Sequence, residues 1–514
     1  MVFGKIRLST VLIFLSLFAL FFATRLINIT SLPIFTDEAI YVRWSQIARQ
    51  DAAWRFISLT DGKQPLFIWG AMNIMRIVKD PLLASRLVSV FAGFGTLIGV
   101  MILSLELFKK KREGSILNQL FGHLNDSKRI GIISGFLFVL FPFALVLDRM
   151  ALYDSLVAMT LVWCLYFEVL LVRYIRLDIA LLLGAVIGGA VLTKTSGFFA
   201  IYLLPLSLLL FDFKKKDASR KLIEWIIFAL IASIIAYLIY SILRLSPFFY
   251  IIDEKNALFI YPISEWTKHP FTYLYGNFNA LIPWLVAYIS IPILLLAALS
   301  LFVKKYRGEK LLLLAWFLVP YVGLGLFGKT LYPRFIYFMT IPLIILAGFS
   351  LSYFFDVIKN KLYSKIILLV SLALYIYAAY FIIFDFSHAP IPQADLGQYI
   401  NSWPAGGGIK EMFAFFNQEA SKGKIFVATQ GTFGSLPTNS VEIYLGDNKN
   451  IEKKGIYPLP EKIPQELIQK AKVMPVYFVF NDSENAPSNW PLILIAKYQK
   501  GIGDRHLSIY RVNP

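Results

Sequence analysis

The sequence predicts a mainly α, polytopic membrane protein of about eleven transmembrane helices, with a small extracytoplasmic α/β domain at its C-terminus. Of its 514 residues, 58% are hydrophobic, whereas soluble globular proteins contain about 45–50% apolar residues. Many uninterrupted apolar runs approach or exceed the ~18–20 residues that span a bilayer as a helix. These runs indicate helical spans, because a transmembrane barrel would show short segments of alternating polarity instead.

Eleven apolar runs are candidate spans, and the basic segments between them predict their direction. The runs cover residues 8–27, 82–108, 130–147, 155–173, 178–193, 196–211, 222–244, 280–303, 310–328, 333–354 and 365–384. Basic clusters, such as Lys109–Arg112, Lys214–Lys216 and Lys304–Lys310, follow alternate runs. The positive-inside rule makes these clusters and the amino terminus cytoplasmic, and it puts the carboxyl terminus outside. We therefore expect an integral protein of the plasma or inner membrane.

The strong positive charge belongs to the membrane part of the chain. The net charge is +18, but residues 385–514 hold 13 Lys and Arg against 12 Asp and Glu. Nearly all of the excess therefore lies in short loops between spans, where the positive-inside rule expects it. This distribution favours membrane topology over a nucleic-acid surface.

A change of composition near Asp385 predicts two domains. Residues 1–384 form the transmembrane domain, with its first outer loop at residues 28–81, and residues 385–514 form the extracytoplasmic α/β domain. In the second domain we expect helices at Ile409–Ser421 and Gln465–Lys472, and strands at Lys424–Thr429, Val441–Leu445, Val476–Asn481 and Ser508–Val512.

The first outer loop begins with a carboxylate pair, Asp37 and Glu38, soon after an apolar span. One interpretation is structural: Thr36 caps a helix whose first turn holds both acids. The other is chemical: Asp37, at the membrane edge, is a general base that takes a proton from an acceptor hydroxyl or amine. The pattern alone leaves both interpretations open.

A second acidic pair, Asp148 and Asp154, lies where one span ends and the next begins. An ion pair between Asp148 and Arg149 and a helix cap at Asp154 would explain these residues structurally. Acids at the membrane edge are costly unless they have partners or a function. That cost favours a functional Asp154 and leaves the role of Asp148 open.

Four cations on the same predicted face are the basic counterpart of these acids: Lys63, Lys194, Lys329 and Arg334. A lysine whose stem lies along lipid while its ammonium reaches water is the structural alternative. Lys194, however, lies in a turn of only a few residues, which keeps its ammonium near the level of lipid phosphates. A cation there can pair with a phosphate and stabilise it as a leaving group.

Taken in order, these motifs resemble those of the membrane-embedded GT-C glycosyltransferases, specifically the protein O-mannosyltransferase and aminoarabinose (lipid A) transferase group. Asp37-Glu38 resembles the acidic site in that family's first loop, and Lys63-Gln64-Pro65-Leu66 resembles its Lys-Pro-Pro-Leu stretch. Arg149–Ser155 and Leu192–Gly197 resemble its Arg-x-x-Leu-Leu-Asp-Ser and Leu-Thr-Lys-Gly stretches. Arg334 is similar to the arginine of its Arg-Tyr-x-x-Pro region.

The resemblance implies a GT-C-like fold and an inverting transfer of sugar from a polyprenyl-phosphate donor to a lipid, glycan or protein on the outer face. It implies Asp37 as the catalytic base, with Glu38 and Asp154 also at the catalytic site. It implies donor-phosphate contacts from Lys63, Lys194, Arg334 and Lys329, with support from Asp148 and Arg149.

Other functional classes make different demands on the sequence. No cofactor is implied, and His123, His269, His388 and His506 are too dispersed for a metal-ligand motif. A divalent cation bound at an acid pair stays open.

A transporter or lipid flippase is the alternative, and it would place ionisable residues or Gly and Pro breaks near mid-membrane. A third possibility is a non-catalytic partner protein. The polar residues instead gather at one face, which favours an enzyme.

Overall fold

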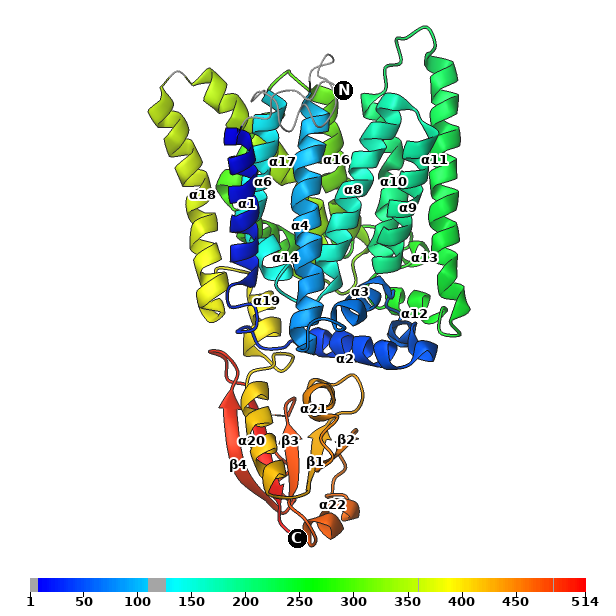
Figure 1. Ribbon diagram of the computed structural model, residues 1–514. Helices are drawn as coiled ribbons and strands as arrows, with labels where there is room; N and C mark the ends of the chain where they lie inside the picture. Colours follow the sequence, from blue (N-terminus) through cyan, green and yellow to red (C-terminus); the bar gives the residue numbers. More distant parts are fainter. Residues whose placement is uncertain (1–7, 110–125, 359, 484) are drawn as a thin grey trace.

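The computed structural model describes residues 8–109, 126–358, 360–483 and 485–514 and shows a helical bundle joined to a small α/β domain (Figure 1). In Figure 1 the bundle is above, the α/β domain is below, and α2 lies across the boundary between them. Lys110–Arg112 of the first basic cluster and His123 lie outside the described residues.

Within the described residues, six helical segments are long and apolar enough to cross a membrane. They are α4 (Pro81–Phe108), α8 (Tyr153–Tyr174), α11 with η5 (Ala218–Tyr240 and Ser241–Leu245), α16 (Arg307–Phe327), η6 with α17 (Pro333–Ile336 and Tyr337–Val357), and α18 (Lys361–Phe384). A bent pair, α14 (Leu274–Ile289) and α15 (Ile291–Ser300), would be a seventh span. The predicted helical membrane architecture is therefore confirmed.

Shorter helices complete the bundle. They are α1 (Leu8–Leu26), α6 (Asp126–Leu140), α7 (Pro142–Leu147), α9 (Leu177–Thr193), and the run of η3 (Thr195–Phe198), α10 (Phe199–Leu203) and η4 (Leu204–Leu210). Pro205 lies in the first turn of η4 and has no N–H to donate, so it interrupts the α-helical hydrogen bonding after α10. The helix pair α14 and α15 turns by 93° at Ser290, just before Pro292.

The first outer loop folds into α2 (Thr36–Gln50), η1 (Ala52–Trp54), η2 (Ile57–Asp61) and α3 (Leu66–Ile74). The expected cap at Thr36 is wrong, because the Thr36 hydroxyl and N–H both donate to the carbonyl of Pro404, at 2.8 and 3.0 Å. The backbone N–H of Phe35 instead donates to the Glu38 carboxylate at 3.0 Å. The loop between α11 and α14 forms two further short helices, α12 (Ile251–Ala257) and α13 (Ile263–Trp266).

A fully buried ion pair fixes the start of α2 to the bundle. Arg86 of α4 donates through Nε and Nη2 to the two carboxylate oxygens of Glu38, at 2.8 Å each. The Ala151 N–H donates to the same carboxylate at 2.7 Å, and Arg86 Nη1 donates to the Leu32 carbonyl at 3.0 Å. One carboxylate therefore joins three separate stretches of the chain.

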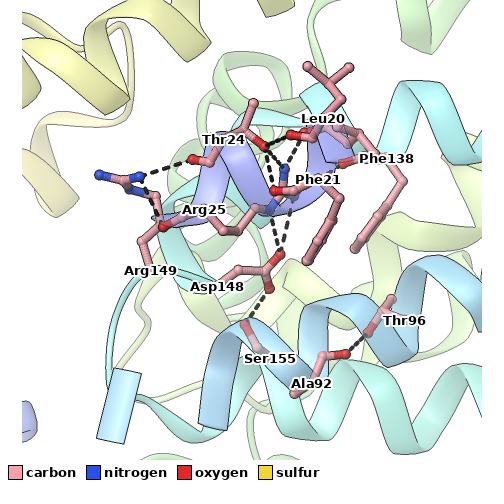
Figure 2. Close-up of polar contacts among 11 residues, drawn as sticks. Leu20, Phe21, Thr24, Arg25, Ala92, Thr96, Phe138, Asp148, Arg149 and Ser155 are labelled. Atoms are coloured by element: carbon pink, nitrogen blue, oxygen red, sulfur yellow. Dashed lines mark hydrogen bonds and ion pairs between the residues drawn. The ribbon is translucent and has the colours of Figure 1, made fainter. Parts of the chain in front are cut away.

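Asp148 and Arg149 hold the end of α1, as Figure 2 shows. Arg25 donates to the Asp148 carboxylate at 3.2 Å, and Ser155 donates to its other oxygen at 2.7 Å. Arg149 donates to backbone carbonyls at the end of α1, including that of Ile27 at 2.7 Å. Such carbonyls lack partners within the helix, so a cation there is favourable. The expected ion pair between Asp148 and Arg149 is therefore wrong.

The α/β domain is a five-stranded sheet in the order β2-β1-β3-β5-β4. β1 pairs in parallel with β2 and β3, and β5 pairs antiparallel with β3 and β4. Its elements are α20 (Ile409–Lys422), β1 (Ile425–Gln430), α21 (Leu436–Leu445), β2 (Ile451–Ile456), α22 (Gln465–Ala471), β3 (Val476–Phe480), β4 (Leu492–Gln499) and β5 (His506–Val512). A connector of η7 (Phe386–His388), α19 (Gln393–Leu396) and η8 (Gly397–Asn401) leads into it.

Five predicted elements of this domain are confirmed within a few residues, and one is wrong. Val441–Leu445 was expected as a strand, but it is the end of α21, which begins with Pro437 in its first turn. β2 and β4 were not predicted. Both are edge strands with many exposed residues, so their burial does not alternate clearly.

We predict that Arg86→Met destabilises the protein strongly, by about 3–5 kcal/mol, because it leaves the buried Glu38 carboxylate without its cation. The measurement is thermal unfolding of the purified protein in detergent. Arg220→Met is the control, since Arg220 forms an exposed ion pair within α11 and should contribute less than about 1 kcal/mol. Equal effects of the two changes would contradict this account.

Candidate functional site

A cavity of about 340 Å³ lies where the first outer loop meets the bundle. Its polar lining includes Lys63, Asp154, Lys194, Lys255 and Arg334. Its apolar lining comes from residues of α8, α10, η6 and α17, and from Phe259 and Ile260 after α12. The structure thus brings together four residues that the sequence singled out from four distant stretches, and the cavity is both cationic and apolar.

Asp37 is held at this site by Arg334. Arg334 Nη2 donates to Asp37 Oδ2 at 2.8 Å, across 297 positions of sequence. The Asp37 side chain is 27% exposed and that of Arg334 is 12% exposed. The guanidinium also lies 5.8 Å from the ring centroid of Phe35 and 5.2 Å from that of Tyr332. The carboxylate is therefore oriented and still accessible.

Asp154 and Lys194 form a second ion pair in the cavity wall, with Lys194 Nζ 2.7 Å from Asp154 Oδ1. The ammonium also lies 4.9 Å from the centroid of the Phe335 ring. Lys194 follows the end of α9, and the next residue, Thr195, accepts a hydrogen bond from Gln64 at 2.8 Å. This bond links the turn around Lys194 to the first outer loop beside Lys63.

Lys63 differs from the other cations of the cavity. It has no ion-pair partner among the described residues, and its ammonium lies 5.4 Å from the centroid of the Phe259 ring. Burial lowers the pKa of Lys63 to about 8, although nearby Asp37 partly opposes that effect. A half-buried cation without a fixed partner is available to an anionic ligand.

Lys255 is a lining residue that the sequence analysis did not select. Its ammonium lies 2.5 Å from Asp61 Oδ1, so it joins α12 to the first outer loop. The only available signal was its position in a predicted outer-face loop. Tyr41 and Tyr153 also line the cavity and were missed, because tyrosine near a membrane surface is common.

The remaining predicted site residues lie apart from the cavity lining. Lys329 is exposed, and its ammonium is 3.5 Å from the Ala257 carbonyl. Glu38, Asp148 and Arg149 are buried in the hydrogen-bond networks described above. Among the residues that the structure describes, no group of three or more His, Cys, Asp or Glu side chains could hold a metal ion.

The charges of the site nearly balance. Arg334, Lys194 and Lys255 are paired with Asp37, Asp154 and Asp61 respectively. Within the described part of the chain, Lys63 is left as the uncompensated charge of the lining while it is protonated. The arrangement is suited to a singly charged anion bound next to an accessible carboxylate.

Comparison with solved structures shows the class of fold to which the bundle and its cavity belong. The chain has the fold of the GT-C glycosyltransferases. The predicted resemblance to that group is confirmed at the level of the fold. A comparison with protein-family models gives no match, and a comparison with curated proteins gives none either.

The particular proteins with this fold include ArnT from Cupriavidus metallidurans and AglB from Archaeoglobus fulgidus. ArnT bound to undecaprenyl phosphate is 14% identical with a TM-score of 0.58, and the match covers 98% of this chain and 99% of that one. ArnT in the apo state is 14% identical with a TM-score of 0.55, and the match covers 98% of each chain. The archaeal oligosaccharyltransferase AglB is 12% identical with a TM-score of 0.52, and the match covers 92% of this chain and 69% of that one. That structure is a complex with an inhibitory peptide and a dolichol-phosphate.

We predict that Lys63 titrates near pH 8, well below the ~10.4 of an ordinary lysine, because burial disfavours its charged form. Its ammonium is protonated below this pH and neutral above it. The measurement is NMR of the protein after reductive methylation with ¹³C-formaldehyde, with the Lys63 signal assigned by its loss in Lys63→Gln. A Lys63 signal that titrates like an ordinary lysine would contradict the assignment.

Proposed function

We propose that this protein is an inverting membrane glycosyltransferase that moves a sugar from a polyprenyl-phosphate donor to a hydroxyl or amine on the outer face of the membrane. The observation that carries the proposal is the cavity, in which the unpaired Lys63 lies near the Asp37–Arg334 pair. Its lining by bundle helices gives a lipid chain an apolar path. The shared fold with ArnT bound to undecaprenyl phosphate, and with AglB in complex with a dolichol-phosphate, supports this class of donor.

The charge of the site supports a monophosphate donor. A sugar linked to a lipid through one phosphate carries a single negative charge, which matches the one uncompensated charge of Lys63. Lys194 and Arg334 lie in the same lining and contribute further charge-assisted hydrogen bonds. The lipid chain follows the apolar side chains of Val157, Phe199 and Phe338.

In the transfer step, the acceptor oxygen or nitrogen bonds to the anomeric carbon from the face opposite the phosphate. The bond between that carbon and the phosphate oxygen breaks, and the acceptor proton passes to Asp37. The leaving polyprenyl phosphate gains one negative charge as Asp37 loses its own. Protonation of Asp37 weakens its hold on Arg334, so the guanidinium becomes available as the charge on the phosphate grows.

The other selected residues receive different roles in this proposal. Asp154 holds Lys194 toward the cavity, and Glu38 positions the start of α2 through Arg86. Asp148 and Arg149 support the end of α1. We assign no donor contact to Lys329, because it lies outside the cavity lining.

We propose the topology that the sequence predicts. Eleven spans result if the six long segments and the bent pair are joined by α1, α9, the run at residues 195–210, and α6 together with α7. The amino terminus is then cytoplasmic, and the site lies on the outer face beside the extracytoplasmic domain of residues 385–514. The protein belongs to the plasma or inner membrane, and its acceptor is a lipid, glycan or protein.

We predict that Asp37→Asn lowers the rate of transfer by about 10²–10⁴-fold, because the amide cannot accept the acceptor proton. The assay follows loss of radiolabelled sugar from a panel of polyprenyl-phosphate sugars, with purified protein in lipid and membrane extract as the source of acceptor. Asp51→Asn, at the other end of α2, is the control and should stay active. Full activity of Asp37→Asn would remove the base assignment, and no donor consumption by the wild type would favour a transporter.

We predict that Lys63→Gln weakens binding of undecaprenyl phosphate by about tenfold or more, since hydrogen bonds to charged groups contribute about 1.5–3 kcal/mol. The measurement is binding to purified protein by calorimetry near pH 7, where most Lys63 is protonated. Lys329→Gln is the matched control and should bind like the wild type. An equal loss in both variants would point to a general charge effect and contradict the role of Lys63.

A further inference from the structure

Asp395 is a buried carboxylate that neither the sequence analysis nor the proposed mechanism uses. It lies in α19, within the connector between the last span and the α/β domain, and its side chain is inaccessible. The hydroxyl of Tyr288, from α14, donates to its Oδ2. The phenol of Tyr399, from η8, lies beside the same carboxyl.

This cluster reaches the catalytic pair through one aromatic ring. Tyr399 packs edge-on against Phe35, with ring centroids 5.1 Å apart. Arg334 lies 5.8 Å from the centroid of the same ring and holds Asp37. The positive charge of Arg334 acts on Asp395, and so does the negative charge of Asp154. Asp395 is thus electrostatically part of the site although it touches neither cavity nor solvent.

A purely structural role would not require an acid here. An asparagine could accept the hydrogen bond from Tyr288 without the cost of burying a charge. Asp395 is also not the N-cap of its four-residue helix, which is Pro392. The carboxyl group therefore provides what an amide of similar shape cannot, namely a negative charge that depends on pH.

We propose that Asp395 is a positioning residue for the donor phosphate, acting through Arg334. When Asp395 is protonated, the charge of Arg334 acts only on Asp37 and on the donor phosphate. When Asp395 is ionised, it adds a negative charge on the Arg334 side of the cavity, which offsets part of the guanidinium charge and opposes the phosphate. This inference rests on the proposed function, because it presumes a phosphate donor in the cavity.

The expected pH dependence has a definite sign. Burial raises the pKa of Asp395 to about 7, although Tyr288 and Arg334 oppose that effect. Asp395 is therefore mostly neutral at pH 6 and mostly ionised at pH 8, and donor binding should weaken as the pH rises between these values. Lys63 loses its charge near pH 8 and weakens binding further, so the contribution of Asp395 is the difference between wild type and Asp395→Asn.

The test is binding of undecaprenyl phosphate to purified full-length protein from pH 5.5 to 9. Between pH 6 and 8 the wild type should lose about five- to tenfold in affinity beyond the loss in Asp395→Asn, which has no ionisation at this position. Tyr288→Phe removes a hydrogen bond that favours the carboxylate, so it should move the midpoint to higher pH. Asp385→Asn, an exposed acid of the same connector, should keep the wild-type midpoint.

Each outcome separates the inference from the proposed function. Parallel profiles of wild type and Asp395→Asn, with the ligand bound, would overturn the role of Asp395 and leave the function intact. An unmoved midpoint in Tyr288→Phe would also overturn it. No binding by the wild type at any pH would overturn the proposed function and this inference with it. Infrared difference spectra between pH 6 and 8 should show the protonated carboxyl of Asp395, a signal absent from Asp395→Asn.

Discussion

The site depends on the buried ion pair between Glu38 and Arg86. Neighbouring residues of a helix point about 100° apart, so Asp37 and Glu38 cannot face the same surroundings. Because Glu38 is fixed inside by Arg86 and the Ala151 N–H, Asp37 is turned toward Arg334. Breaking the buried pair would therefore release both the first turn of α2 and the position of Asp37. This explains why two adjacent acids have such different environments.

Ion pairing also determines which charge is available at the site. Each paired cation comes from a different segment of the chain, and each pair joins two segments: Arg334 to α2, Lys194 to the start of α8, and Lys255 to η2. The pairs therefore assemble the cavity wall and cancel most of its charge. Lys63 remains unpaired among the described residues, and desolvation of its ammonium lowers its pKa. The same wall thus combines ion pairs that fix it with one cation that has no paired carboxylate in the described part of the chain.

The sequence predicted the membrane architecture, and it predicted that five site residues converge: Asp37, Lys63, Asp154, Lys194 and Arg334. The second prediction was possible because successive spans place alternate loops on the same side of the membrane. It could not separate Arg334 from Lys329, five positions away, since only the packing of η6 turns one inward. It also missed the scaffold role of Glu38. A signal was present: Arg25 and Arg86 stand inside apolar runs, and such cations require buried partners. The strand expected at Val441–Leu445 failed because β-prone residues also suit a buried helix face.

The α/β domain is bound to α2 at several points, which argues against a passive appendage. Arg43 of α2 pairs with Glu442 of α21 at 2.8 Å, and Gln46 donates to the Ile443 carbonyl at 3.2 Å. Thr36 is held by the Pro404 carbonyl. Helix α2 is thus held by the bundle on one side and by the domain on the other, as its position in Figure 1 shows. Since Asp37 lies in the first turn of this helix, the bond from Thr36 to the domain adds to the Glu38–Arg86 pair in fixing the position of the carboxylate.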